Sequence, residues 1–470
     1  MARQADTVGL PKRLPLVAMP DNRDESTRRD AKLVNGYVEK DEFTGDFHIY
    51  KRPGLAEDAT LSESGNGLGC YNWQGDVYAI FGSSIYKNGV ALTGSVNTAG
   101  GMYRWSSTLG ATPNLQFGNG AATYNTDGST FAAISGANFP TTTVKGIGYL
   151  DGTIYVMDST AATIHGSDDL NDPVNWTDLL NVIEAQIEPD GPVALAKQLV
   201  YILALKEWST EIFYDAQNAT GSPLGPVQGA KINYGCANAD SIQEMDGVLF
   251  WLSTNRSSSP QIIKVDNLKF EIVSTPAIDR LIGDADLTAV RSFAIKYEGH
   301  KFYGISFVNT NITLVYDAAQ RIWAQWTDSS GNYFPVVATT FSSDNELLLQ
   351  HATNGKMYMM DTEYFTDDGS VITFDLYTPN FDGGINRRKQ MNSLVFVGDQ
   401  RAGSVLQVRW NDEDYTHEKW SNFRKVDMNT PRPLLPFCGT FRRRAHHIRH
   451  QCNTPLRLQA IEMQLDLGVI

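Results

Sequence analysis

The stretch Ser241-Ile-Gln-Glu-Met-Asp-Gly-Val-Leu-Phe-Trp-Leu252, followed by Gln261-Ile-Ile-Lys-Val-Asp266, shows how this chain is built. Two apolar runs flank the dipeptide Asp246-Gly247, and a third apolar run ends at an aspartate. Asp-Gly favours a tight hairpin, because glycine adopts a positive φ at little steric cost. The stretch therefore predicts three successive antiparallel β-strands.

The same unit recurs along most of the chain. Five further copies lie at residues 71–88, 147–165, 193–215, 293–317 and 336–361. In the last five of the six copies, the turn glycine or its equivalent lies at positions 152, 198, 247, 299 and 345, so the unit repeats every 46 to 52 residues. A seventh, shorter hairpin is predicted at Asp127-Gly128, inside the longer gap between the first two copies.

This period decides between two all-β architectures. Repeats of roughly 40 to 50 residues, each with several short strands, are typical of β-propeller blades. A β-sandwich has a similar local strand spacing, but it does not repeat a whole unit of three or four strands. We therefore predict a β-propeller of six to seven blades over residues 66–369, with a β-sandwich as the alternative.

The two flanks lack the repeat. Residues 1–65 are rich in prolines and charges, and they predict an extended N-terminal arm. Residues 370–470 contain longer β-like runs, and the run at 455–467 alternates apolar and polar positions at its start. Such alternation is typical of a half-buried strand. We predict a separate C-terminal, β-sandwich-like domain over residues 370–470.

Composition excludes several classes of protein. No run approaches the roughly 18 apolar residues of a membrane-spanning helix, and the first residues do not resemble a secretory signal. The four cysteines (Cys70, Cys236, Cys438 and Cys452) are scattered singly, without a Cys-x-x-Cys pair. This pattern speaks against a zinc ribbon or a disulfide framework and indicates folding in a reducing cytoplasm. We predict no cofactor and no metal.

Charge is distributed unevenly. Residues 371–470 carry 14 Lys and Arg against 10 Asp and Glu, a balance of +4. The first 370 residues carry 25 against 43, a balance of −18. Tight, sequence-specific binding of DNA needs clustered cations, so the acidic body argues against it. It does not argue against DNA that passes nearby without binding.

The run Phe441-Arg-Arg-Arg-Ala-His-His-Ile-Arg-His450 is the most unusual local feature. Clustered guanidinium groups favour carboxylates or phosphates through bidentate hydrogen bonds. We predict that Arg442, Arg443, Arg444 and Arg449 form a docking surface for an acidic partner, with a solvated face as the alternative. Most acidic residues end strands or lie in turns, where they satisfy backbone N–H groups, so we predict no catalytic residues.

Three stretches together resemble the tail hub or nozzle proteins of short-tailed double-stranded DNA bacteriophages, also called packaged-DNA stabilisation proteins. The first stretch is residues 29–38, which leads to residues 50–55. The second is residues 208–215 with 235–238 and the Asp246-Gly247 hairpin. The third is the basic run, closed by residues 453–458 and an alternating last strand.

The resemblance implies a structural virion protein without enzymatic activity. It implies a homo-oligomer, a hexameric ring in the virion tail below the portal and its adaptor ring, assembled in the host cytoplasm. This ring would attach tailspikes or fibres and a plug or needle protein. It would retain the packaged DNA and provide its exit channel, without sequence-specific binding. A propeller glycoside hydrolase and a host-binding adhesin are the alternatives.

Overall fold

The computed structural model describes residues 12–14, 16, 31–41, 46–109, 112–168, 175–413 and 419–467. Much of the predicted N-terminal arm, including Arg29, therefore lies outside the described residues. The chain forms two compact units: unit 1 comprises Met1–Ala56, Ile312–Phe334 and Met360–Ile470, and unit 2 comprises Glu57–Asn311 and Pro335–Met359. Within the described ranges, no helix has the length and apolar character needed to cross a membrane.

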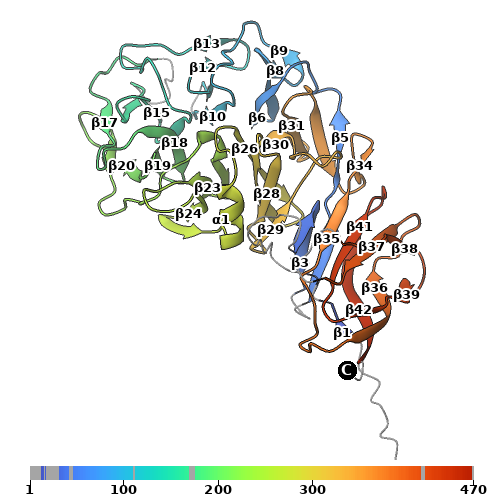
Figure 1. Ribbon diagram of the computed structural model, residues 1–470. Coiled ribbons are helices and arrows are strands. Elements are labelled where there is room, and N and C mark those ends of the chain that lie inside the picture. The colour runs from blue at the N-terminus through green and yellow to red at the C-terminus, as the bar shows by residue number, and fades with distance from the viewer. Residues whose placement is uncertain are drawn as a thin grey trace, which may run out of the picture. The chain divides into compact units, whose positions relative to one another are not determined.

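Unit 2 begins with five four-stranded antiparallel sheets, which follow one another along the chain (Figure 1). The first sheet is β6 (Gly67–Trp73), β7 (Asp76–Phe81), β8 (Ser84–Lys87) and β9 (Val90–Ala91). The second is β10 (Arg104–Ser107), β11 (Leu115–Gly118), β12 (Thr123–Thr126) and β13 (Phe131–Ala133). The third is β14 (Gly148–Leu150), β15 (Thr153–Met157), β16 (Thr163–Gly166) and β17 (Val182–Glu184).

The fourth sheet is β18 (Pro192–Gln198), β19 (Tyr201–Lys206), β20 (Thr210–Asp215) and β21 (Leu224–Pro226). The fifth is β22 (Gln243–Met245), β23 (Val248–Ser253), β24 (Gln261–Asp266) and β25 (Lys269–Ile272). Two further modules follow: β26 (Val290–Tyr297) with β27 (His300–Phe307), and β30 (Val336–Phe341), β31 (Leu347–His351) and β32 (Met357–Asp361). The described residues of unit 2 thus supply seven successive sheet modules, in agreement with the predicted repeat.

The predicted tight turns join the first two strands of most modules. Asp246 and Gly247, between β22 and β23, have φ values of 53° and 78°. Positive φ at both positions matches the right-handed twist of the flanking strands, which is why Asp-Gly is favoured there. Asp127-Gly128 differs, because it lies between the third and fourth strands of its sheet, β12 and β13.

Unit 2 closes on itself, because its last module lies against its first sheet. Gln350 on β31 accepts a hydrogen bond from the Gly69 N–H (2.7 Å) and donates one to the Ile80 carbonyl (2.8 Å). Gly67 lies so close to β31 that a Cβ atom there would be 2.3 Å from the His351 carbonyl oxygen. Leu348 and Met357 also share a buried cluster with residues of β6 and β7. The modules therefore form a closed ring, and the propeller prediction is confirmed.

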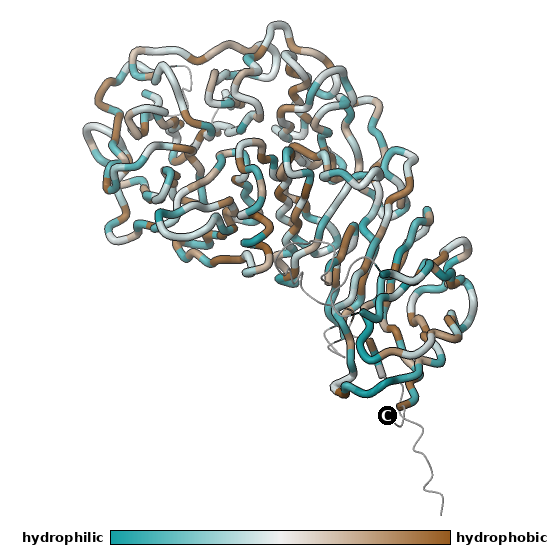
Figure 2. The backbone as a smooth tube through the Cα atoms, in the orientation of Figure 1, coloured by the Kyte–Doolittle hydropathy of each residue, from teal (hydrophilic) through white to brown (hydrophobic). Residues whose placement is uncertain are grey.

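The middle strands of the modules carry most of the buried apolar side chains. The strands β19, β23 and β27 are almost entirely buried along their length. Figure 2 shows hydrophobic residues gathered along strands inside unit 2. At about 25 cal/mol per Å² of apolar surface removed from water, this burial is the main stabilising contribution in each blade.

Unit 1 is a two-layer β-structure that includes the segment predicted as a C-terminal domain, residues 370–470, and it also draws on Met1–Ala56 and Ile312–Phe334. It consists of two β-sheets that face each other across one hydrophobic core. Its core draws on both layers, for example Leu406 and Ile448 on one side and Phe396 and Ile461 on the other.

The strands of unit 1 come from three separate parts of the chain. The first part supplies β1 (Lys12–Arg13), β2 (Lys32–Val34), β3 (Gly36–Lys40) and β4 (Phe47–Lys51). The second supplies β28 (Ile312–Asp317) and β29 (Ile322–Gln325). The third supplies β33 (Thr366–Asp367), β34 (Ser370–Val371), β35 (Phe374–Tyr377), β36 (Lys389–Gly398), β37 (Val405–Asn411), β38 (Arg424–Asp427), β39 (Leu434–Pro436), β40 (Thr440–Phe441), β41 (Ala445–His450) and β42 (Arg457–Leu467). Strand β5 (Gly54–Asp58) runs from unit 1 into unit 2.

Within unit 1, one layer has the strand order β28-β29-β2-β35-β41-β37-β38. The other layer has the order β3-β4-β42-β36-β39, with β1 beside β42 and β40 beside β36.

The described residues of unit 2 include two helical elements, and neither was predicted. The helix α1 (Pro276–Gly283) begins after Thr275, whose side chain accepts a hydrogen bond from the Ile278 N–H. A threonine N-cap followed by proline at the first helical position is a known start signal. The second element, η1 (Ala239–Ser241), is a single 3-10 turn.

Candidate functional site

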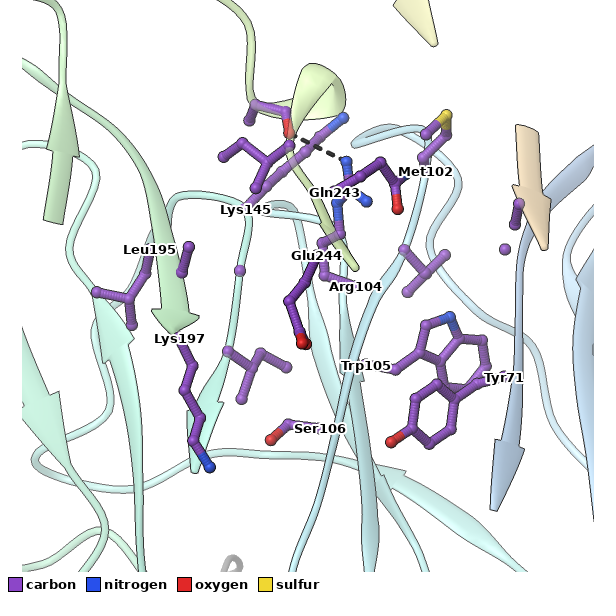
Figure 3. A pocket seen from close by; sticks show the side chains of 18 of the residues that line it. Tyr71, Met102, Arg104, Trp105, Ser106, Lys145, Leu195, Lys197, Gln243 and Glu244 are labelled. Atoms are coloured by element: carbon purple, nitrogen blue, oxygen red, sulfur yellow. Dashed lines mark hydrogen bonds between the residues drawn. The ribbon is translucent and has the colours of Figure 1, made fainter. Parts of the chain in front are cut away.

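A cavity of about 410 Å³ lies within unit 2 (Figure 3). It is lined by residues of the first strands of several modules, among them β6, β10, β14, β18, β22 and β30. First strands that converge on one space from successive sheets are the expected arrangement around the axis of a propeller. This cavity is the axial space of the ring.

Two of the three cations that line this cavity are bound to neighbouring groups of unit 2. The Lys145 ammonium lies 2.7 and 2.9 Å from the two carboxylate oxygens of Asp240. Arg104 donates a hydrogen bond to the Ala239 carbonyl at 3.1 Å, drawn as a dashed line in Figure 3. Burial lowers the pKa of Arg104, and the charge of Asp240 opposes that shift. These contacts fix η1 against the inner strands.

Lys197 is the third cation. Its ammonium lies 5.7 Å from the centre of the Tyr149 ring. Burial lowers the pKa of Lys197, and the charge of Glu244 acts in the opposite direction. Figure 3 shows Lys197 on one side of the cavity and the stacked rings of Tyr71 and Trp105 on the other.

The cavity does not offer paired acids for glycoside hydrolysis. That chemistry uses two carboxyl groups, one on each side of the scissile bond. Among the described residues that line the cavity, Glu244 is the single acid, and its carboxylate accepts a hydrogen bond from the Gly247 N–H. The geometry of this cavity therefore does not match the two-carboxylate arrangement of a glycoside hydrolase.

The predicted docking residues lie on or just before β41, and the structure separates them into two groups. Arg444 is buried, with 1% of its surface exposed. Its guanidinium group donates to both carboxylate oxygens of Asp412 (2.5 and 2.8 Å) and to the Cys438 carbonyl (2.6 Å). It also packs against the rings of Phe441 and Trp410. Arg444 is thus engaged inside unit 1.

Arg449 is also engaged inside unit 1. It donates to both carboxylate oxygens of Asp375, at 2.7 and 3.1 Å. His447 Nδ1 accepts a hydrogen bond from Arg409, so its Nε2–H donates to Asp375 at 2.7 Å. Burial raises the pKa of Asp375, but the hydrogen bonds from His447 and Arg449 outweigh it, and the pKa lies below its ordinary value.

Arg442 and Arg443 form the other group. Arg442 is exposed, and the Arg443 side chain is 40% exposed, with its Nε 3.6 Å from Asp382. Arg442 and Arg443 lie in the bend between β40 and β41, whereas the guanidinium groups of Arg444 and Arg449 meet Asp412 and Asp375. Burial does not follow the alternation of β41, because His447 on one face is as buried as His446, Ile448 and His450 on the other. The composition of the run revealed the cluster, but only the contacts with distant carboxylates identify its engaged members.

The two groups should respond differently to mutation. We expect Arg444→Leu to lower the free energy of unfolding of unit 1 by about 2 kcal/mol, because charge-assisted hydrogen bonds are lost while the partly exposed Asp412 regains water. Arg443→Leu should cost less than about 1 kcal/mol. Urea unfolding followed by hydrogen exchange of peptides from β41 measures both values. Equal losses would contradict the assigned difference in burial.

The closed ring of sheets and its axial cavity place the chain among the all-β propeller proteins. A family model described as bacteriophage P22 Gp10, β-propeller, matches residues 15–365, which is about three quarters of the chain. The chain belongs to this phage stabilisation family, and it is a phage structural protein. The resemblance found in the sequence is thereby confirmed.

Comparison with solved structures finds distant likenesses. Virginiamycin B lyase from Staphylococcus aureus is 9% identical with a TM-score of 0.43, over 65% of this chain and 98% of that chain. The extracellular domain of a putative one component system from B. thetaiotaomicron is 9% identical with a TM-score of 0.43, over 85% of this chain and 58% of that chain. BamB from Moraxella catarrhalis is 11% identical with a TM-score of 0.35, over 66% of this chain and 100% of that chain. No curated protein matches the chain.

Proposed function

We propose that this chain forms the ring-shaped tail hub, or nozzle, of a short-tailed phage. In this role it would sit below the portal and its adaptor ring, retain the packaged DNA and provide the exit channel. Membership of the phage stabilisation family over residues 15–365 is the observation that carries the proposal. The role requires binding and not catalysis, and the chain would act in the virion after assembly in the host cytoplasm.

The charge of unit 2 suits a protein that DNA must pass. From the sequence, unit 2 contains 28 acidic residues against 14 basic residues, a balance of −14. A negative surface does not attract phosphates, so it would not slow the movement of DNA. Closure of the sheet ring also leaves few free strand edges, which limits edge-to-edge aggregation at high local concentration.

The domains would divide this work. We propose that the predicted propeller, residues 66–369, is the rigid body, apart from Ile312–Phe334 and the residues after Met359, which belong to unit 1. Residues 370–470 would form a platform for neighbours, and residues 1–65 would be an arm whose strands β2, β3 and β4 complete unit 1. Within the basic run, Arg442 and Arg443 would make these contacts, because their side chains are more exposed than those of Arg444 and Arg449. The proposed partners are further copies of the chain, the adaptor ring, tailspikes or fibres, and a plug or needle protein.

The mass of the assembled complex tests the proposal. When the full-length chain is mixed with purified portal and adaptor rings, we expect six copies of it to bind to each portal–adaptor complex. Native mass spectrometry measures the mass of the resulting complex. The control is the same mixture without the adaptor ring. A chain that stays monomeric with the adaptor and cleaves a bacterial polysaccharide would overturn the proposal.

A further inference from the structure

Lys389, at the start of β36, holds two surface segments of unit 1 together. Only 2% of its surface is exposed. Its ammonium group donates to the carbonyls of Ile385 (2.5 Å), Arg387 (3.0 Å) and Arg442 (2.8 Å). Three carbonyls on one buried ammonium fix the backbone of both segments. The loop at 385–388 is therefore held beside the start of the basic run.

This arrangement gathers four arginines, Arg387, Arg388, Arg442 and Arg443, which we call the arginine cluster. Arg387, Arg388 and Arg442 are exposed, and within the described part of the chain no carboxylate forms an ion pair with them. Arg443 lies 3.6 Å from Asp382. Like charges held close together repel one another, and a partner that neutralises them relieves this repulsion. Arg387 and Arg388 lie outside the basic run at residues 441–450, which the sequence analysis identified.

The negative charge that would complement the arginine cluster lies on unit 2, which every copy of this chain contains. The whole net charge of −14 falls on unit 2, because unit 1 contains 25 basic and 25 acidic residues. Asp151 and Asp215 are two of the acids of unit 2. Their carboxyl groups lie side by side, and the hydrogen bond and the charge of Asp215 raise the pKa of Asp151.

We propose that the arginine cluster docks on the acidic unit 2 of a second copy of this chain. The inference rests on the proposed ring, because a ring of identical chains must join one surface to a different surface of the next copy. Guanidinium groups bind carboxylates in bidentate geometry, and such charge pairs steer association and fix its orientation. The arginine cluster would thus set the direction in which copies join.

Charge reversal tests this interface on the full-length chain. The variant Arg387→Glu/Arg388→Glu/Arg442→Glu changes three exposed arginines and leaves Lys389 in place. The control Arg401→Glu/Lys425→Glu/Arg432→Glu makes the same change of charge at exposed positions of unit 1. We expect the cluster variant to raise the dissociation constant between copies by roughly tenfold or more at low salt, and the control by much less. Analytical ultracentrifugation and native mass spectrometry with adaptor rings measure this constant, and circular dichroism checks the fold.

Cross-linking identifies the partner. Arg388→Lys keeps the charge and supplies an amine, which a carbodiimide couples to a carboxylate in contact. Using a mixture of isotope-labelled and unlabelled chains, we expect mixed-isotope links from position 388 to acids within residues 57–311 or 335–359. Rings that form with unchanged affinity in the cluster variant, or links only to other proteins, would overturn the inference and leave the proposed ring intact. A wild-type chain that forms no ring with adaptors would overturn the proposed function itself.

Discussion

Arg52→Met should lower the free energy of unfolding of unit 1 by about 3–5 kcal/mol, the usual cost of removing one partner of a buried ion pair. The Arg52 guanidinium is fully buried and donates to both carboxylate oxygens of Asp367, at 2.9 and 2.6 Å. Methionine keeps most of the volume, so the loss comes from the charge left behind on Asp367.

The other contacts of Arg52 explain why the loss affects the whole unit. The guanidinium also donates to the Thr327 carbonyl (2.9 Å) and to the Asn35 side-chain oxygen (3.0 Å). It lies 4.9 Å from the centre of the Phe334 ring. One side chain thus connects all three chain segments that build unit 1.

The control is an exposed ion pair between the same two residue types, an arginine and an aspartate. Arg13 and Asp46 are 2.8 Å apart, but their side chains are 54% and 40% exposed. Arg13→Met should therefore cost less than about 1 kcal/mol. Urea unfolding followed by hydrogen exchange of unit 1 peptides compares the variants. A loss below about 1 kcal/mol for Arg52→Met would contradict the assigned role, and Arg52→Met/Asp367→Leu should recover much of the stability.

Acid should destabilise unit 1 through its buried histidines. Burial, helped by the charge of Arg444, lowers the pKa of His446 to about 3. Burial and the charge of Lys51 lower the pKa of His450 to about 3 as well. The unfolded chain takes up these protons near pH 6.5, while the folded chain stays neutral. Stability is therefore complete above pH 6.5 and falls as the pH drops towards 3, by about 2–3 kcal/mol per histidine at pH 4.5.

His446→Leu tests the size of this effect. Neither ring nitrogen of His446 has a hydrogen-bond partner among the described residues, so leucine should cost less than about 1 kcal/mol at pH 7. At pH 4.5 the variant should keep about 2–3 kcal/mol of the free energy of unfolding that the wild-type chain loses. His450→Leu is the matched control, because it also removes the 3.1 Å contact with Ser404 and should destabilise at pH 7. Identical pH dependence in wild type and His446→Leu would contradict the assignment.

The sequence predicted the propeller because its signals are local. A turn dipeptide such as Asp246-Gly247 and the apolar runs beside it specify a hairpin without distant partners. Their repetition then indicates the ring. The helix α1 was missed, although Thr275 followed by Pro276 carries a start signal. A single helical turn signal is easily overlooked among many strands.

The sequence did not show which arginines of the basic run are engaged inside unit 1, and the reason is physical. A run of arginines shows that charge is concentrated, but it does not show which side chains face the interior. Arg444 pairs with Asp412, and Arg387 joins Arg442 through Lys389, which is 53 residues away from Arg442. Such contacts arise only when distant strands pair in the folded unit. Composition alone therefore cannot assign them.

Ring closure constrains the order in which the chain matures. Glu63 donates its N–H to the Gly355 carbonyl (2.7 Å), and Glu57 pairs with Lys356 (2.7 Å), so the two ends of unit 2 meet across almost 300 residues. During translation, the early blades form an open arc whose final neighbour has not yet been made. Contacts of such long separation form late and slowly. The ring of unit 2 can therefore close only after its last blade has been synthesised, so the order of synthesis fixes the last step of its folding.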